Sequence, residues 1–170
     1  FYLAMNVRYQ TAGIVWVGAL LMSGTISSFA ASTALDRYVA EADPAYHYEL
    51  VKTISGPGFK QHVIDMTSQT WLTPQEVDRT VWQHWLRIVE PDQVDHSTSL
   101  VFIGGGANGG EAPSEVDARL AGIAMETKSI VAELSMVPNQ ALRFVGDDEG
   151  RKEDSLIAYG WDKHLRGGRD

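Results

Sequence analysis

Two stretches of alternating apolar and polar residues predict a β-hairpin over residues 46–71. The first stretch, 46–54, places aromatic and β-branched residues between polar ones, and the second, 59–71, is again rich in Val, Ile, Thr and aromatic residues. Between them lies Ser55-Gly56-Pro57-Gly58, a sequence typical of turns. Two runs of this composition around such a turn favour an antiparallel pair of strands.

Residues 82–89 predict the next strand, because Leu86 and Ile88 would share one face and Trp85 and Val89 the other. Before it, residues 73–76 read Thr-Pro-Gln-Glu, a capping box with proline at the first helical position, which predicts a brief helix. After it, the return through residues 91–97 is short. We therefore expect this strand to be the antiparallel neighbour of the strand that follows.

The segment Leu100–Ile103 and the glycines after it form the most strongly marked part of the chain. Four bulky apolar residues lead into five glycines within residues 104–110. A short apolar run bounded by turn residues predicts a central strand buried on both faces. Glycine lets a ligand approach the backbone, so we expect a loop with exposed N–H groups where α/β proteins place binding sites.

Strand and helix then alternate. Pro113 and Ser114 predict a helix start with Ser114 as the N-cap. An inward stripe follows at helical spacing, formed by Val116, Leu120, Ile123 and Ala124. Residues 129–134 predict a buried strand parallel to the one at 100–103, which completes a βαβ unit.

A last helix is predicted over residues 153–165, with Ile157, Trp161 and Leu165 aligned on one face. An antiparallel hairpin leading into parallel βα units is the order of an α/β-hydrolase. The predicted fold class is therefore α/β, the N-terminal portion of an α/β-hydrolase-like fold. Since such a sheet continues past residues 130–134, we expect one unpaired strand edge and a partly uncovered face on this helix.

The N-terminus has the order of a secretory signal. Arg8 precedes an apolar, uncharged run over residues 11–22, and Ser28-Phe29-Ala30 offers a small-residue cleavage site after Ala30. We expect residues 1–30 to be a signal peptide and 31–170 the hydrolase-like part, so the protein would be secreted or periplasmic. The run is short for a membrane span, so no stable span is expected after cleavage, although an uncleaved anchor or a buried helix remains an alternative.

Composition excludes several function classes. The chain has 170 residues, a net charge of -8 and no cysteine. Nucleic acid is not an expected partner, because binding it needs a basic surface. Thiol chemistry is excluded, and the five histidines show no metal-ligand spacing and fit ordinary strand or surface positions. We expect no metal and no cofactor.

The remaining large and acidic side chains are expected to be structural. Packing in the core and hairpin is the better interpretation of the tryptophans than a carbohydrate platform, for Trp71, Trp82, Trp85 and Trp161. Glu133 and Asp162 fit hydrogen-bonded structural roles better than functional ones.

Several strings of this sequence closely resemble the PhoPQ-activated pathogenicity-related protein family. They are Thr67–Trp71, the 82–91 strand, Phe102–Gly110, Glu133–Gln140 and Ala158–Lys163. The resemblance runs from about Thr33 to the C-terminus. It implies an exported protein with an α/β-hydrolase-like fold that is considerably longer than this chain, of which these residues are the N-terminal part.

The resemblance also bears on the chemistry. A hydrolase nucleophile sits in a G-x-S-x-G-type elbow after the second helix of the fold, and no such string occurs here. The elbow would lie beyond Asp170, so we expect no catalytic residue within this chain. Gly104, Gly105 and Gly106 match the loop that supplies oxyanion-hole N–H groups, with Asn108 as a side-chain donor.

Other interpretations of the glycine loop stay open. The glycines would also suit a tight turn with close helix packing. Residues 104–109 satisfy G-x-G-x-x-G literally, with Glu133 where a ribose-binding acid would lie, although the helix start at Ser114 is too late to face a pyrophosphate.

Three functions remain in order of preference. They are a serine-type hydrolase acting on a peptide or ester substrate, a secreted binding or signalling protein on a hydrolase-like fold, and a dinucleotide-binding domain. Partner proteins are not identified by these residues.

Overall fold

The computed structural model describes residues 32–167, and the elements below belong to the unit that begins at Thr33. In chain order they are α1 (Ala34–Ala40), β1 (His47–Gly56), β2 (Phe59–Thr70), β3 (Val81–Pro91), β4 (Leu100–Ile103), α2 (Ala118–Thr127), β5 (Val131–Leu134) and α3 (Glu153–Gly167). The proposed signal peptide, residues 1–30, lies outside the described residues. No helix among those described is long and apolar enough to cross a membrane.

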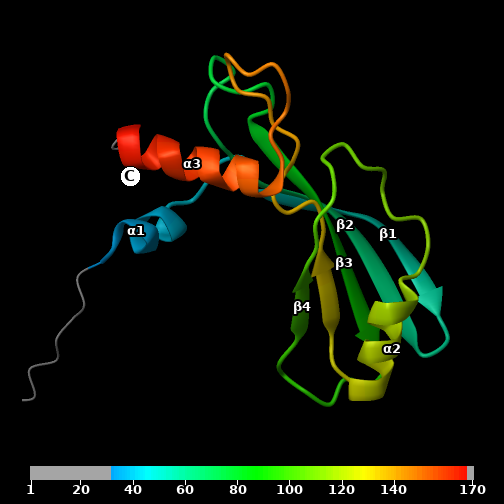
Figure 1. Ribbon diagram of the computed structural model, residues 1–170. Helices are drawn as coiled ribbons and strands as arrows, with labels where there is room; N and C mark the ends of the chain where they lie inside the picture. The colour runs from blue at the N-terminus through cyan, green and yellow to red at the C-terminus, as the bar shows by residue number, and fades with distance from the viewer. Residues whose placement is uncertain (1–31, 168–170) are drawn as a thin grey trace, which may run out of the picture. The chain divides into compact units, whose positions relative to one another are not determined.

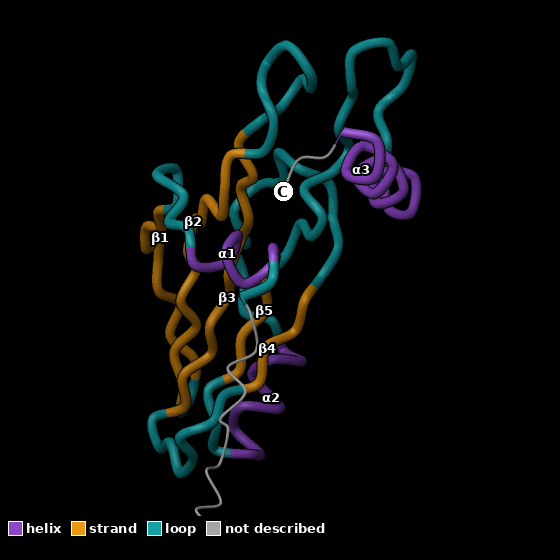
Figure 2. The backbone as a smooth tube through the Cα atoms, turned by 90° about the vertical axis from the view of Figure 1, so that its left-hand side faces the viewer, coloured by secondary structure: helices purple, strands orange, loops and turns teal. Residues whose placement is uncertain are grey.

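The five strands form one mixed sheet in the order β1-β2-β3-β5-β4 (Figure 1). The pairs β1–β2, β2–β3 and β3–β5 are antiparallel, and the pair β4–β5 is parallel. Helix α2 packs on the sheet against β2, β3 and β5 (Figure 2). An antiparallel meander followed by a βαβ unit confirms the predicted fold class.

The predicted hairpin is confirmed, and its turn needs glycine. Gly58 has φ +83°, a conformation that a side chain would strain. Two irregularities interrupt the pairing: one between Leu50 and Lys52 in β1, the other between Thr67 and Gln69 in β2. The second makes Ser68 the extra residue of a β-bulge.

The predicted place of residues 100–103 is wrong. β4 lies at the edge of the sheet, and Leu100, Val101 and Ile103 are exposed rather than buried on both faces. The expectation that the strand at 82–89 is the neighbour of the strand at 100–103 is also wrong. β5 lies between β3 and β4 and pairs with both. The physical reason is packing: Val131 of β5 is fully buried with Val89 and α2, so β5 takes the inner position.

Two helix starts differ from prediction. Residues 73–76 form a single turn, in which the Thr73 hydroxyl donates to Glu76 at 2.9 Å, and no helix follows. α2 begins at Ala118 with Asp117 as its N-cap, not at Ser114. Buried Gln61 explains the delay, because it donates to the Glu115 carbonyl at 2.9 Å and accepts from the Asp117 amide at 2.8 Å. Both backbone groups are thereby held outside the helix.

Two apolar clusters make the core. One joins α2 to the sheet through Phe59, Val89, Leu120, Ala121, Ala124 and Val131, which confirms the predicted α2 stripe. The other gathers Val77, Leu142, Phe144 and Leu156, with Trp71 and Trp82 packed against it. Trp71 lies edge-on to both Trp82 and Phe144, with ring centroids 5.7 and 5.9 Å apart.

Helix α3 carries its predicted apolar stripe, but little covers it. Ile157, Trp161 and Leu165 are 51%, 70% and 79% exposed. Leu156 is the one buried residue among the described residues of this helix. The expectation of a partly uncovered face is confirmed, whereas the expectation that Trp161 packs in the core is wrong.

Candidate functional site

The glycine loop lies beside residues 135–141, where β4 and β5 end. Hydrogen bonds continue the pairing past both strands, from the Gly104 amide to Leu134 O at 2.8 Å and from the Met136 amide to Gly105 O at 2.9 Å. The Val137 amide donates to Gly104 O at 3.0 Å. The first two glycines are therefore anchored through their carbonyls, as an extension of a rigid sheet.

The amides of Gly105 and Gly106 remain unused. Both residues are exposed, and neither amide donates a hydrogen bond to any of the described residues. Gly106 has φ +125°, a backbone conformation that other residues rarely adopt, so the position favours glycine. A Cβ on Gly105 would meet nothing within 4 Å. The loop thus offers two adjacent exposed amides, with open space at the Cβ position of Gly105.

Asn108 is engaged within the fold. Its side-chain amide donates to Ala141 O at 3.0 Å and approaches Asn139 O at 3.5 Å, while its backbone amide donates to Gln140 O. Its carboxamide N–H groups therefore hold the loop to residues 139–141. The structure brings Asn108 to the predicted loop, but its side chain is not a free donor.

An ion-pair network lies under the loop. Arg87 pairs with Asp117 at 3.0 Å and with Glu133, and Arg119 pairs with the other oxygen of Glu133 at 2.7 Å. Arg119 also stacks 4.6 Å from the centre of the Phe102 ring. A Cβ at Gly104 would come to 3.4 Å from Glu133 Oε1, so the carboxylate lies next to the start of the loop.

This network counts against dinucleotide binding. Glu133 is held by two arginines, as expected for a structural acid, and is not presented to a ribose. The N-terminus of α2 is occupied by Asp117, whose carboxylate accepts from the Arg119 and Leu120 amides at 3.0 Å. A pyrophosphate would compete with a negative charge already at that helix end.

The sequence analysis did not identify one polar pair, formed by half-buried Ser68 and buried His84. The Ser68 hydroxyl lies 2.8 Å from His84 Nε2, and His84 is 3% exposed. Burial lowers the pKa of His84 below its usual 6.5, against a smaller raising effect of the Ser135 carbonyl. The two residues lie on different strands, and the bulge at Ser68 brings their side chains together. The alternation of apolar and polar residues therefore gives no signal for this contact.

No group of side chains among residues 32–167 has an arrangement that could hold a metal ion.

Comparison with known proteins identifies the family. Residues 35–170 match the family described as PhoPQ-activated pathogenicity-related protein. The chain is 35% identical over 147 residues to the autocrine proliferation repressor protein A of Dictyostelium discoideum, which covers 86% of this chain and 29% of that protein. No solved structure matches the chain. With four fifths of its length matched, the chain belongs to the PhoPQ-activated pathogenicity-related protein family.

Proposed function

We propose that this chain is the N-terminal part of an exported hydrolase-like protein, and that residues 104–106 supply N–H groups to an oxyanion or another anionic ligand group. The observation that carries the proposal is the pair of free, exposed amides at Gly105 and Gly106, fixed to the ends of two parallel strands. Donors held in place in advance stabilise developing negative charge without reorganisation.

The nucleophile of this reaction is proposed to lie outside the present chain. No G-x-S-x-G string occurs within the 170 residues, and the chain spans 29% of the curated relative it matches. Activity on peptide or ester bonds is therefore a proposal about the whole protein. Export is part of it and rests on Arg8, the apolar run 11–22 and Ser28–Ala30. Secreted material should begin at Ala31 when its N-terminus is sequenced.

Two variants of the full-length protein test the loop. Gly105→Pro removes the amide hydrogen, whereas Gly105→Ala keeps it and places a methyl group in open space. Loss of one such donor lowers kcat by about 10²–10³-fold. We expect that loss for proline and a change of only a few fold for alanine, measured with p-nitrophenyl esters and peptide amides.

Circular dichroism and thermal unfolding of both variants serve as the control for folding. Equal kcat for wild type and a folded Gly105→Pro variant would remove the loop from the reaction.

A second candidate function is an exported binding or signalling protein without catalysis. It is favoured by the relative's name, which describes repression of proliferation and no reaction. A full-length protein that turns over neither substrate class and is not labelled by a fluorophosphonate would favour this candidate.

A further inference from the structure

Ser68 lies at a point where the sheet redirects a side chain. Thr67 pairs with Gln83 and Gln69 pairs with Trp82, so Ser68 has no partner in the ladder. Bulges of this kind re-aim side chains and are frequent beside active sites. Here the bulge brings the Ser68 hydroxyl to 2.8 Å from Nε2 of His84 on the neighbouring strand.

The other nitrogen of His84 fixes which atom carries the proton. Nδ1 lies 3.1 Å from the Ser135 carbonyl, which can only accept, so Nδ1 is the protonated nitrogen. Nε2 therefore presents its lone pair to Ser68. Burial lowers the pKa of the ring, which favours the neutral imidazole, the form that can accept a proton. A hydroxyl, a base and a group that orients the base are the parts of an activated nucleophile.

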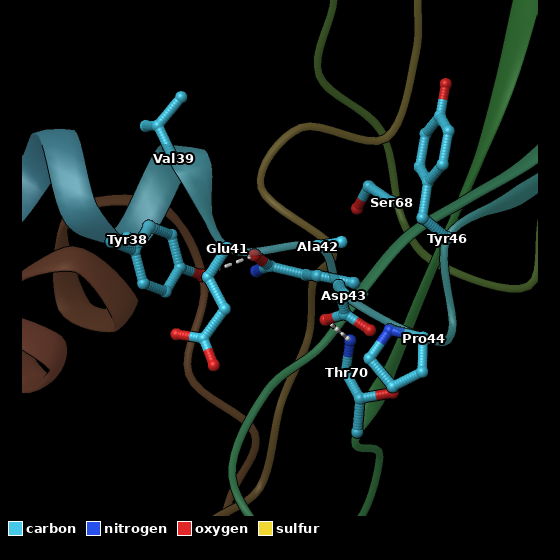
Figure 3. A pocket seen from close by; sticks show the side chains of 10 residues that line it. Tyr38, Val39, Glu41, Ala42, Asp43, Pro44, Tyr46, Ser68 and Thr70 are labelled. Atoms are coloured by element: carbon cyan, nitrogen blue, oxygen red, sulfur yellow. Dashed lines mark hydrogen bonds between the residues drawn. The ribbon is translucent and has the colours of Figure 1, made fainter.

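A pocket opens on Ser68. It has a volume of about 450 Å³ and lies between residues 38–46 and the end of β2. Figure 3 shows Ser68 among its lining residues, with Tyr38 and Tyr46 on either side. Asp43 holds this wall to the sheet, accepting from the Thr70 amide at 2.8 Å.

We propose that Ser68, with His84 as its general base, is a nucleophile of a second reactive site, which accepts neutral or cationic acyl esters in this pocket. This site is separate from residues 104–106 and does not rest on the function proposed for them.

The step balances as an acyl transfer. Ser68 Oγ forms a bond to the acyl carbon while its proton passes to His84 Nε2. The ester C–O bond then breaks, and the leaving alcohol takes that proton from His84. The products are an acylated Ser68, a free alcohol and neutral His84, with no change of oxidation state.

The pocket lining indicates the substrate class. Tyr38 donates to Gln69 Oε1 at 2.8 Å, and the Gln69 amide nitrogen donates to none of the described residues, so it is available to a carbonyl oxygen. The exposed carboxylate of Glu41 has no ion-pair partner among residues 32–167. Beside two tyrosine rings, this negative charge favours a cationic group and disfavours an anionic one.

A fluorophosphonate probe on the full-length protein tests the proposal by peptide mapping. Trypsin cuts after Lys60 and Arg79, and Ser68 is the one serine in the peptide between them. We expect the label on that peptide, its loss in Ser68→Ala, and a labelling rate at least a hundredfold lower in His84→Gln, within the range of general-base effects. A serine beyond residue 170 would be labelled on a different peptide, so failure of the two proposals is distinguishable.

The chain contains a matched control. Thr53 Oγ1 lies 3.0 Å from His62 Nδ1, an exposed hydroxyl–imidazole pair outside that pocket. The variant His62→Gln should leave labelling of the 61–79 peptide unchanged.

A second measurement avoids dependence on the buried His84 variant. The chain has no cysteine, so Ser68→Cys and Thr53→Cys each introduce a single thiol into it. We expect iodoacetamide to react at least tenfold faster with Cys at position 68, where the neutral base accepts the thiol proton. Equal or slower reaction there, or an unlabelled 61–79 peptide in the folded protein, would overturn the proposal.

Discussion

Helices α2 and α3 are built alike and buried differently. Both carry an apolar stripe, and each is held at its entry by a buried glutamine: Gln61 binds the Asp117 amide, and Gln140 binds the Glu153 amide at 2.7 Å. Yet α2, with ten residues, buries three of them, and α3, with fifteen, buries one among those described. The difference lies in the surroundings, because the sheet covers the stripe of α2, whereas the described residues leave most of the α3 stripe exposed.

This contrast shows what an apolar stripe means. Periodicity identifies the face that avoids water, and burial against another element converts that face into stability. Matched substitutions on the two sides therefore measure the difference directly.

The largest contrast is expected between two ion pairs. Glu133, 13% exposed, pairs with Arg87, 20% exposed, whereas Asp162 and Arg166 on α3 are 55% and 81% exposed. Glu133→Ala leaves Arg87 with Asp117 alone and Arg119 without its carboxylate partner, and should lower the free energy of unfolding by about 3 kcal/mol. Asp162→Ala should cost less than about 1 kcal/mol. Urea unfolding measures both, and equal costs would contradict the contrast.

The next largest difference in stability is expected between two leucines, one on each helix. Leu120 of α2 is 0% exposed and Leu165 of α3 is 79% exposed. Leu120→Ala should cost about 3 kcal/mol, from lost burial and the cavity left behind. Leu165→Ala should change stability by no more than about 0.5 kcal/mol. A cost at Leu165 that approaches that at Leu120 in the full-length protein would mean that another segment covers α3.

The two glutamines at the starts of α2 and α3 give a third comparison. Gln61→Ala leaves a carbonyl and an amide at the start of α2 without their partner, and should lower the free energy of unfolding by about 2 kcal/mol. Gln140→Ala leaves one amide at the start of α3 without its partner, and should lower the free energy of unfolding by about 1 kcal/mol. Thermal unfolding with circular dichroism gives the order of the two, and the reverse order would argue against the Gln61 clamp.

The smallest effect concerns His84, a buried residue of β3. Its folded pKa lies below 6.5, so the unfolded chain binds the proton more readily. The free energy of unfolding should therefore decrease as pH falls below about 6.5. His84→Gln should flatten this slope in urea titrations at pH 5 to 7. A protein that becomes more stable on acidification through this window would contradict the assignment.

The local features of the fold were predictable from the sequence, and the long-range ones were not. Alternation identified β1, β2 and β3, and helical spacing identified the inward face of α2. The position of β5 between β3 and β4 depends on the packing of Val131 with Val89, which no local pattern records. The start of α2 was missed for the same reason, since Gln61 lies 56 residues from the backbone amide it holds.

In the candidate site, too, the local feature was predictable from the sequence and the long-range contacts were not. The sequence located the glycine loop, since glycines after an apolar run are visible without a structure. The sequence predicted Asn108 as a free side-chain donor. In the folded chain the carbonyls of residues 139 and 141 lie next to its amide and accept its hydrogen bonds. Ser68 and His84 meet through the register of two strands, and a single bulge residue changes which side chains face each other.

The place of β4 also sets an order of events during synthesis. Its only neighbour among the described strands is β5, and Leu100 pairs with Val131, about 30 residues later in the chain. At about 5–20 residues per second, roughly 2–6 s separate the emergence of the two strands from a ribosome. Through that interval Leu-Val-Phe-Ile has no partner strand, while β1, β2 and β3 are already complete and able to pair. We therefore expect the segment that carries the glycine loop to be a binding site for a chaperone while the chain is being made.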